Sequence, residues 1–130
     1  MLDIFEDELP FDLKAPIVEI LPEDYGIWFV DAMDHPENYE GKVVHFKGRV
    51  MKPEGMGSKY FVPGRMAMTC CADDTTFLGY VCRSSYAPKL KAGQWITVRA
   101  KVRYANVSVY QGEGPVLEAE NIEPAEPIEE

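Results

Sequence analysis

Two adjacent thiols, Cys70 and Cys71, end an apolar run and are followed by Asp73 and Asp74. Thiolates bind soft or borderline metals such as zinc, and a carboxylate just past a strand end can fold back to add an oxygen ligand. Adjacent side chains on a strand point to opposite faces, so a shared ion requires a bulge or turn that brings both sulfurs together. The pattern therefore indicates a candidate zinc site at Cys70, Cys71 and Asp74.

A structural interpretation competes with the zinc site. In it Cys70 and Cys82 are small buried hydrophobic residues, and the two aspartates form a hairpin turn. A turn centred near residue 74 puts Cys70 opposite about Gly79, so that Cys82 lies about 10 Å further along the partner strand. Cys82 is therefore not expected to join a metal site with the other two cysteines.

Basic side chains form the second candidate site. They alternate with apolar residues in the stretches 43–50 and 95–103, where His45 lies in the same series. If these stretches are neighbouring strands, the basic side chains share one outer surface, which suits an anion, a single-stranded nucleic acid or an acidic partner. The candidate anion-binding residues are Lys47, Arg49, Arg99, Lys101 and Arg103.

The elements that must position these residues follow from hydrophobic periodicity. Apolar residues from Tyr25 to Met33 recur at helical spacing after Pro22, which predicts one short amphipathic helix that ends before Pro36. From Gly41 the period changes to two, as in half-buried strands. The expected strands are 43–50, a segment at 60–71 bent near residue 63, and segments at 77–83, 95–103 and about 116–122.

One short helix followed by five strands predicts an all-β fold, namely a small five-stranded barrel of the oligonucleotide-binding (OB) type. A short open sheet packed by the helix is the alternative. We expect residues 1–21 to form an extended acidic arm, 22–124 the helix plus barrel, and 125–130 a disordered acidic tail. In an OB barrel the first and fourth strands are neighbours, which would bring the two basic stretches together.

The charge distribution limits the nucleic-acid interpretation. The net charge of −9 divides into −11 over residues 1–40, +9 over residues 41–110 and −7 over residues 111–130. Acidic ends on the same chain can cover the basic middle and compete with a polyanion. OB barrels also bind strands on the face of their second and third strands. Nucleic acid is therefore not the expected partner, although that face carries the aromatic residues Tyr60, Phe61, Phe77 and Tyr80.

Several segments resemble one known family. They are residues 28–33, 35–44, 46–50, 65–74 and 90–98, together with Gly79. Over about residues 25–124 the chain resembles the soluble C-terminal domain of YcgQ-like permease subunits, and the double cysteine with its following acid is the most specific part. The resemblance implies an OB-like domain, usually attached to N-terminal membrane helices, that works beside a permease and has a link to metal homeostasis.

Two departures from this family affect the interpretation. The chain carries no membrane-spanning segment, so it is an excised domain or a soluble relative, and we expect it to be soluble and cytoplasmic, with a parent protein attached to a membrane. Asp73 is an additional acid, which leaves Asp74 as the matching carboxylate.

We expect no enzyme activity and no direct membrane insertion by this chain. The expected function is an interaction module for a membrane permease partner, with zinc as its cofactor.

Overall fold

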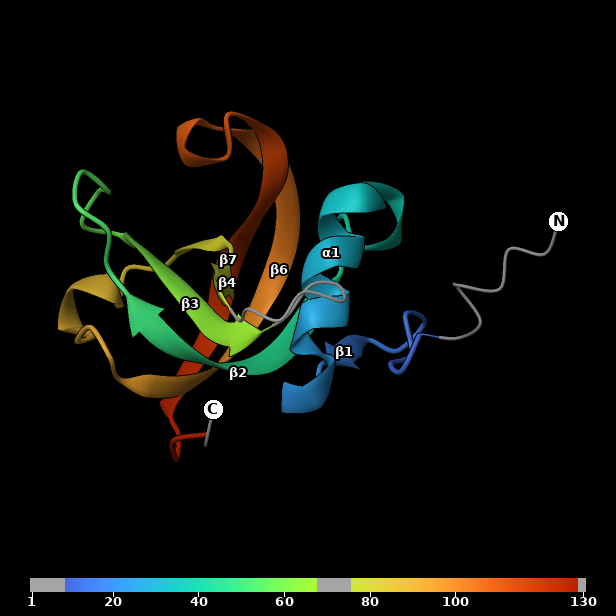
Figure 1. Cartoon of the computed structure of the whole chain (residues 1–130), viewed down its shortest axis with the longest axis horizontal. Helices are drawn as coiled ribbons and strands as arrows, with labels where there is room; N and C mark the ends of the chain where they lie inside the picture. The colour runs from blue at the N-terminus through green and yellow to red at the C-terminus, as the bar shows by residue number, and fades with distance from the viewer. Residues whose placement is uncertain (1–8, 68–75, 129–130) are drawn as a thin grey trace, which may run out of the picture.

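A computed structural model describes residues 9–67 and 76–128 of the 130-residue chain. Within these residues the chain forms one α-helix, seven strands and several short 3-10 turns (Figure 1). The helix follows a short N-terminal strand and precedes the other six strands. The elements are β1 (Ile17–Glu19), α1 (Tyr25–Asp34), β2 (Val43–Met51), β3 (Tyr60–Ala67), β4 (Thr76–Gly79), β5 (Val81–Arg83), β6 (Trp95–Val107) and β7 (Gly112–Pro124).

Five of the strands close into a barrel. β2 pairs antiparallel with both β3 and β6, β3 pairs antiparallel with β5, β5 pairs parallel with β7, and β7 returns antiparallel to β6. Two further strands add to this ring: β1 lies parallel to β2, and β4 lies antiparallel to β3. The predicted all-β fold with a five-stranded barrel and one short helix is confirmed, and so is the expected pairing of the first and fourth barrel strands, β2 and β6.

The barrel strands form because apolar residues alternate with polar ones. In β2, Val44, Phe46 and Val50 are buried and the residues between them are half-buried, apart from Gly48, which continues the inward series. β6 shows the same alternation from Ile96 to Val102. One face of each strand therefore fills the barrel while the other carries the basic side chains outside it.

The third predicted barrel strand, 77–83, is divided in the structure. β4 pairs with the second half of β3, whereas β5 pairs with its first half and with β7, and Tyr80 lies buried between the two. The prediction of one continuous strand was wrong. β3 pairs with β5 at Tyr60 and Phe61 and with β4 from Gly64 to Ala67, so the segment 77–83 supplies two separate partners for it.

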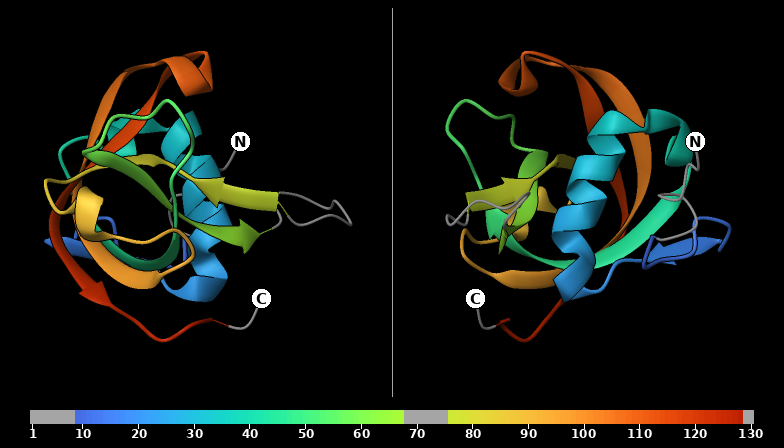
Figure 2. Two further views of the ribbon diagram at one scale, coloured as in Figure 1. Left: turned by 90° about the vertical axis from the view of Figure 1, so that its left-hand side faces the viewer. Right: turned by 45° about the vertical axis from the view of Figure 1, so that its right-hand side comes forward.

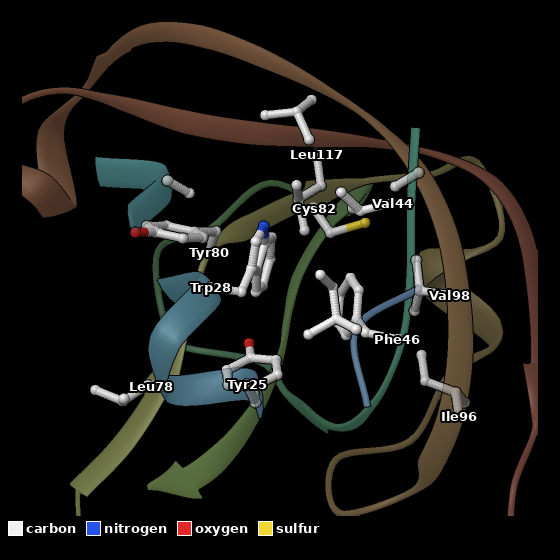
Figure 3. Close-up of a cluster of buried hydrophobic side chains, with 14 of the residues drawn as sticks. Tyr25, Trp28, Val44, Phe46, Leu78, Tyr80, Cys82, Ile96, Val98 and Leu117 are labelled. Atoms are coloured by element: carbon white, nitrogen blue, oxygen red, sulfur yellow. The ribbon is translucent and has the colours of Figure 1, made fainter. Parts of the chain in front are cut away.

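Helix α1 packs its apolar stripe on one end of the barrel (Figure 2). Trp28 is fully buried and its ring lies 5.2 Å from that of Phe46, at the centre of the core (Figure 3). The Tyr104 hydroxyl donates to the Ala32 carbonyl at 2.6 Å, and the Tyr80 hydroxyl donates to a carbonyl of the same helix. Hydroxyl groups on the strands thus hold the helix, including one of its otherwise unpaired C-terminal carbonyls.

The described part of the N-terminal arm lies against the barrel. Val18 and Ile20 are buried, and the Ile20 backbone N–H donates to the His45 carbonyl at 2.9 Å. At the other end of the chain, the Ala125 N–H donates to the Trp95 carbonyl at 3.0 Å. The division into arm, barrel and tail stays a prediction.

The barrel interior holds apolar and aromatic side chains, and within the described ranges no charged residue and no residue classed as polar is buried. The described residues contain no helix that is both long and apolar enough to cross a bilayer. A filled interior leaves the outer surface as the place where this fold meets a ligand or partner.

Candidate functional site

The residues of the predicted zinc site, Cys70, Cys71 and Asp74, lie outside the described residues, and their role stays a prediction. The adjoining strand register is known. Gly79 pairs with Gly64, whereas the sequence interpretation placed it opposite Cys70, so that register was wrong by six positions along β3.

Cys82 is part of the core. It is fully buried in β5, where it pairs with Phe61 of β3 and Leu117 of β7. Burial raises the pKa of the Cys82 thiol well above its ordinary value, which disfavours the thiolate that a metal needs. Phe61, the partner of Cys82 on β3, is six residues from Ala67, the last described residue of that strand. Cys82 therefore lies about 20 Å along the strand from this end of β3. The expectation that Cys82 is a small buried hydrophobic residue is confirmed.

Within the described ranges, no three histidine, cysteine or acidic side chains lie together so that they could hold one metal ion. This finding does not extend to residues 68–75, where the cysteine pair lies. Asp74 is the candidate that the sequence supplies there.

The basic flank, which we define as Lys47, Arg49, Arg99, Lys101 and Arg103, lies on the outer surface of β2 and β6. Arg99 pairs with His45, Lys47 with Thr97 and Arg49 with Trp95. The structure therefore brings the two basic stretches together as expected. Whether they bind an anion stays a prediction.

Acidic side chains of neighbouring strands accompany this flank. Arg103 donates to Glu118 of β7 at 3.0 Å, and the Arg99 guanidinium lies 3.5 Å from Glu120. On the other side, the His45 ring lies 2.8 Å from Glu19 of β1. Glu118 and Glu120 of β7 thus pair with two arginines of the flank, whereas Glu19 of β1 pairs with His45; that the acidic ends cover the whole basic middle stays a prediction. An incoming anion must compete with these carboxylates, although exposed ion pairs are weak.

Arg49 occupies a different environment at the end of the flank. Its guanidinium carbon lies 5.8 Å from the ring centres of both Phe77 and Trp95, within the range of a cation–π contact. The sequence offers Phe77 for base stacking, and in the structure its ring lies beside the Arg49 guanidinium, where β2, β4 and β6 meet.

Among the other aromatic residues considered for stacking, Phe61 and Tyr80 are fully buried, and Tyr60 is half-buried. The Tyr80 hydroxyl donates a hydrogen bond to the Phe29 carbonyl of α1, which holds this ring in the core. Tyr60 is therefore the residue of this set that can contact a ligand from the outer face, where it lines two hollows.

The first hollow, of about 340 Å³, lies between the β2–β3 loop and the β6–β7 turn. These segments rise from the same side of the barrel, the loop in green and the turn in orange in Figure 1. Its volume is within the range of about 300–1,000 Å³ that is usual for small-molecule sites. Its apolar lining comes from Pro53, Met56, Tyr60, Val81, Val107 and Val109.

The second hollow, of about 280 Å³, lies on the other side of Tyr60 and is charged. Arg83 pairs across the strands with Tyr60 on one side and with Glu118 on the other. Arg103 also lines it, in its ion pair with Glu118. We call the two hollows together the Tyr60 groove: its first half is apolar and its second half carries two guanidinium groups.

Sequence reasoning missed this groove. Tyr60 was recognised as an aromatic residue on the outer face, but Met56 and Val109 lie in loops without periodicity. Their position depends on how two loops far apart in the sequence approach each other. The available signal was the length of the loops that flank an OB barrel, which commonly bind ligands.

Solved structures resemble this chain only weakly. A chain from Leishmania major Friedlin assigned as an aspartyl-tRNA synthetase is 14% identical, with a TM-score of 0.44 over 82% of this chain and 20% of that one. The aspartyl-tRNA synthetase of Entamoeba histolytica is 11% identical, with a TM-score of 0.41 over 70% and 20%. This chain therefore spans about a fifth of either protein, and likenesses of this size carry no inference about function.

Among curated proteins, none matches the chain. One family model does match, and it covers residues 5–130, which include every element described above. Its description is the DUF1980 C-terminal domain. The chain therefore belongs to the DUF1980 C-terminal domain family.

Proposed function

We propose that this chain is a non-enzymatic binding module that works beside a membrane permease. The observation that carries the proposal is the Tyr60 groove, an open and largely apolar site on a barrel whose interior is filled. Convergent apolar side chains with a few polar groups are typical of a binding site. The permease partner follows from the resemblance of residues 25–124 to the soluble domain of YcgQ-like permease subunits.

A site-specific cross-link tests the interaction. A photoreactive benzoylphenylalanine replaces Val109, which is 63% exposed at the rim of the groove, and the control carries it at Ile27, which is 49% exposed on α1. We expect a membrane-fraction adduct, identified by mass spectrometry as a permease subunit, from position 109 and not from position 27. Adducts of equal yield from both positions, or none with a membrane protein, would contradict the proposal.

We further propose that Cys70, Cys71 and Asp74 bind zinc as part of this module. Support comes from the residue types and from the match to the family's double cysteine. The test is the zinc content of protein purified without chelator, before and after Cys70→Ser and Cys71→Ser. One zinc per chain that is lost in both variants is expected, with Cys82→Ser as the control that keeps it. Substoichiometric zinc in the unchanged protein would exclude the site.

The alternative function is binding of an anion or single-stranded nucleic acid by the basic flank. The β2–β6 register favours it, because it gathers Lys47, Arg49 and Arg99 on one surface. Binding through phosphate contacts weakens as salt rises, with a slope set by the number of contacts. Oligonucleotide affinity that is independent of salt, or unchanged by Lys47→Ala, would exclude this function.

A further inference from the structure

We propose that the Tyr60 groove binds a small amphipathic anion, with its apolar body in the first half of the groove and its anionic group at Arg83. This inference rests on the proposed function, because it names the ligand class of the same groove. It differs from the zinc proposal because it uses no residue of the cysteine pair, and from the basic flank because it places the anion at Arg83; Arg103 is the residue that the groove and the flank share.

The apolar half of the groove suits a compact hydrophobic group. Val81 forms part of its floor, while Met56 and Val109 reach it from the β2–β3 loop and the β6–β7 turn. Val109 is an aliphatic residue that is 63% exposed, so its side chain is open to a ligand. A ligand in the hollow would cover apolar surface that now faces water, which is the main source of affinity in sites of this kind.

The charged half of the groove supplies one available guanidinium. Glu118 lies between Arg83 and Lys101 in the strand register, and its carboxylate accepts from Arg103 at 3.0 Å. That ion pair partly neutralises Arg103, whereas Arg83, which lies across from Glu118 in the β5–β7 register, is exposed. A planar guanidinium presents paired donors that match a carboxylate, sulfonate or phosphate group.

The one acidic residue in the apolar half, Glu54, is exposed on the β2–β3 loop. Its charge is therefore separated from the guanidinium groups by the length of the groove. The charge separation favours a ligand of one orientation, with its anionic end away from Glu54.

The ligand is small because the groove offers no row of free stacking rings. A nucleic-acid strand needs successive aromatic platforms along a positively charged channel. Here Phe61 and Tyr80 are buried, and Phe77 contacts Arg49 elsewhere. Tyr104 lines the second half of the groove, but it packs against the core and donates its hydroxyl to a carbonyl of α1. Tyr60 lines both halves. A ligand with one ring system and one anionic group fits this arrangement.

Two fluorescent probes test the proposal on the purified full chain. Anilinonaphthalene sulfonate carries an aromatic body and a sulfonate, and N-phenylnaphthylamine has the same rings without the charge. We expect one sulfonate probe to bind per chain. Arg83→Ala should weaken that probe by about tenfold or more, since hydrogen bonds to charged groups are among the strong ones. It should leave the neutral probe unchanged.

Matched variants distinguish the groove from general surface effects. Lys91→Ala removes an exposed positive charge that lies in neither the groove nor the basic flank, and it should leave both probes unchanged. Tyr60→Ala should weaken both probes, whereas Tyr60→Phe, which keeps the ring, should weaken neither. Circular dichroism of each variant confirms that it is folded, because unfolded chains bind these dyes through exposed apolar surface.

Two results would overturn the proposal: no sulfonate probe bound by the folded protein, or an Arg83→Ala variant that loses no more affinity than Lys91→Ala. Either result could occur while the cross-link from position 109 persists, in which case the binding module stands without this ligand class. Loss of the cross-link with intact probe binding would instead remove the permease partner and leave the ligand.

Discussion

The hydroxyl of Tyr110 accepts a hydrogen bond from the backbone N–H of Val81 at 2.8 Å. The same hydroxyl donates to the Pro115 carbonyl at 2.7 Å, so one side chain joins the tip of the β6–β7 hairpin to β5. A Cβ on Gly114 would lie 2.6 Å from the Tyr110 ring, which explains the glycine at that position. Tyr110 therefore fixes the wall of the Tyr60 groove relative to its floor.

Removing this hydroxyl should destabilise the protein. Tyr110→Phe leaves the Val81 N–H and the Pro115 carbonyl without their partner in a largely buried place. We expect the free energy of unfolding to fall by about 1–3 kcal/mol, the usual cost of an unsatisfied buried polar group. Urea denaturation followed by tryptophan fluorescence measures it. Tyr86→Phe, at a ring that is 49% exposed, should change stability by less than about 0.5 kcal/mol.

Stability should also fall at alkaline pH. Burial raises the pKa of Tyr110 from 10.0 to about 12, and it raises the pKa of Tyr25, Tyr39 and Tyr80 as well. Between pH 10 and pH 12 the unfolded chain therefore loses phenolic protons that the folded chain keeps, so ionisation favours unfolding as pH rises. Urea midpoints measured across this range should decrease, and less steeply in Tyr110→Phe. Equal slopes in the two proteins would contradict the assignment to Tyr110.

Sequence periodicity predicted the barrel because its strands are half-buried. Val44 and Phe46 in β2, like Ile96 and Val98 in β6, alternate with polar residues and bury one face. The helix was equally accessible, since Trp28 lies on a stripe of helical spacing. Such local patterns depend on residues a few positions apart, and they identify elements and faces.

Register and loop placement were not accessible in the same way. The pairing of Gly79 with Gly64 depends on how β3 divides its length between β4 and β5, and the ion pair of Arg103 with Glu118 depends on the register of the β6–β7 hairpin. The Tyr60 groove depends on the approach of Met56 and Val109 from separate loops. These relationships join residues far apart in the sequence, so no local period encodes them. The metal site at the cysteine pair is predicted from residue types alone, without knowledge of where the side chains lie.

Glycine is required where β3 and β4 come closest. A Cβ on Gly64 would meet the carbonyl oxygen of Leu78 and would lie 2.6 Å from the Phe77 ring. Gly64→Ala should therefore destabilise the protein by about 1–3 kcal/mol, as overpacking does. Gly112→Ala is the matched control, because a Cβ there meets nothing within 4 Å. Urea denaturation of both variants tests the contact, and equal stability of the two would contradict it.

The burial of Cys82 makes a prediction about thiol reactivity. In the Cys70→Ser, Cys71→Ser double variant, Cys82 is the remaining thiol of the three in the chain. It is fully buried and burial raises its pKa, so both access and ionisation oppose attack on a disulfide reagent. We expect Ellman's reagent to release no thionitrobenzoate from the folded variant and a full equivalent in urea.

The rate of that reaction separates two ways in which Cys82 can become exposed. If only global unfolding exposes the thiol, labelling in sub-denaturing urea should follow the unfolding equilibrium, and Gly64→Ala should accelerate it in proportion to the stability lost. Cys82 lies in β5, which pairs with both β3 and β7, so local opening would have to break two ladders. Rapid labelling of the folded protein without denaturant would show that β5 is not held in the barrel as described.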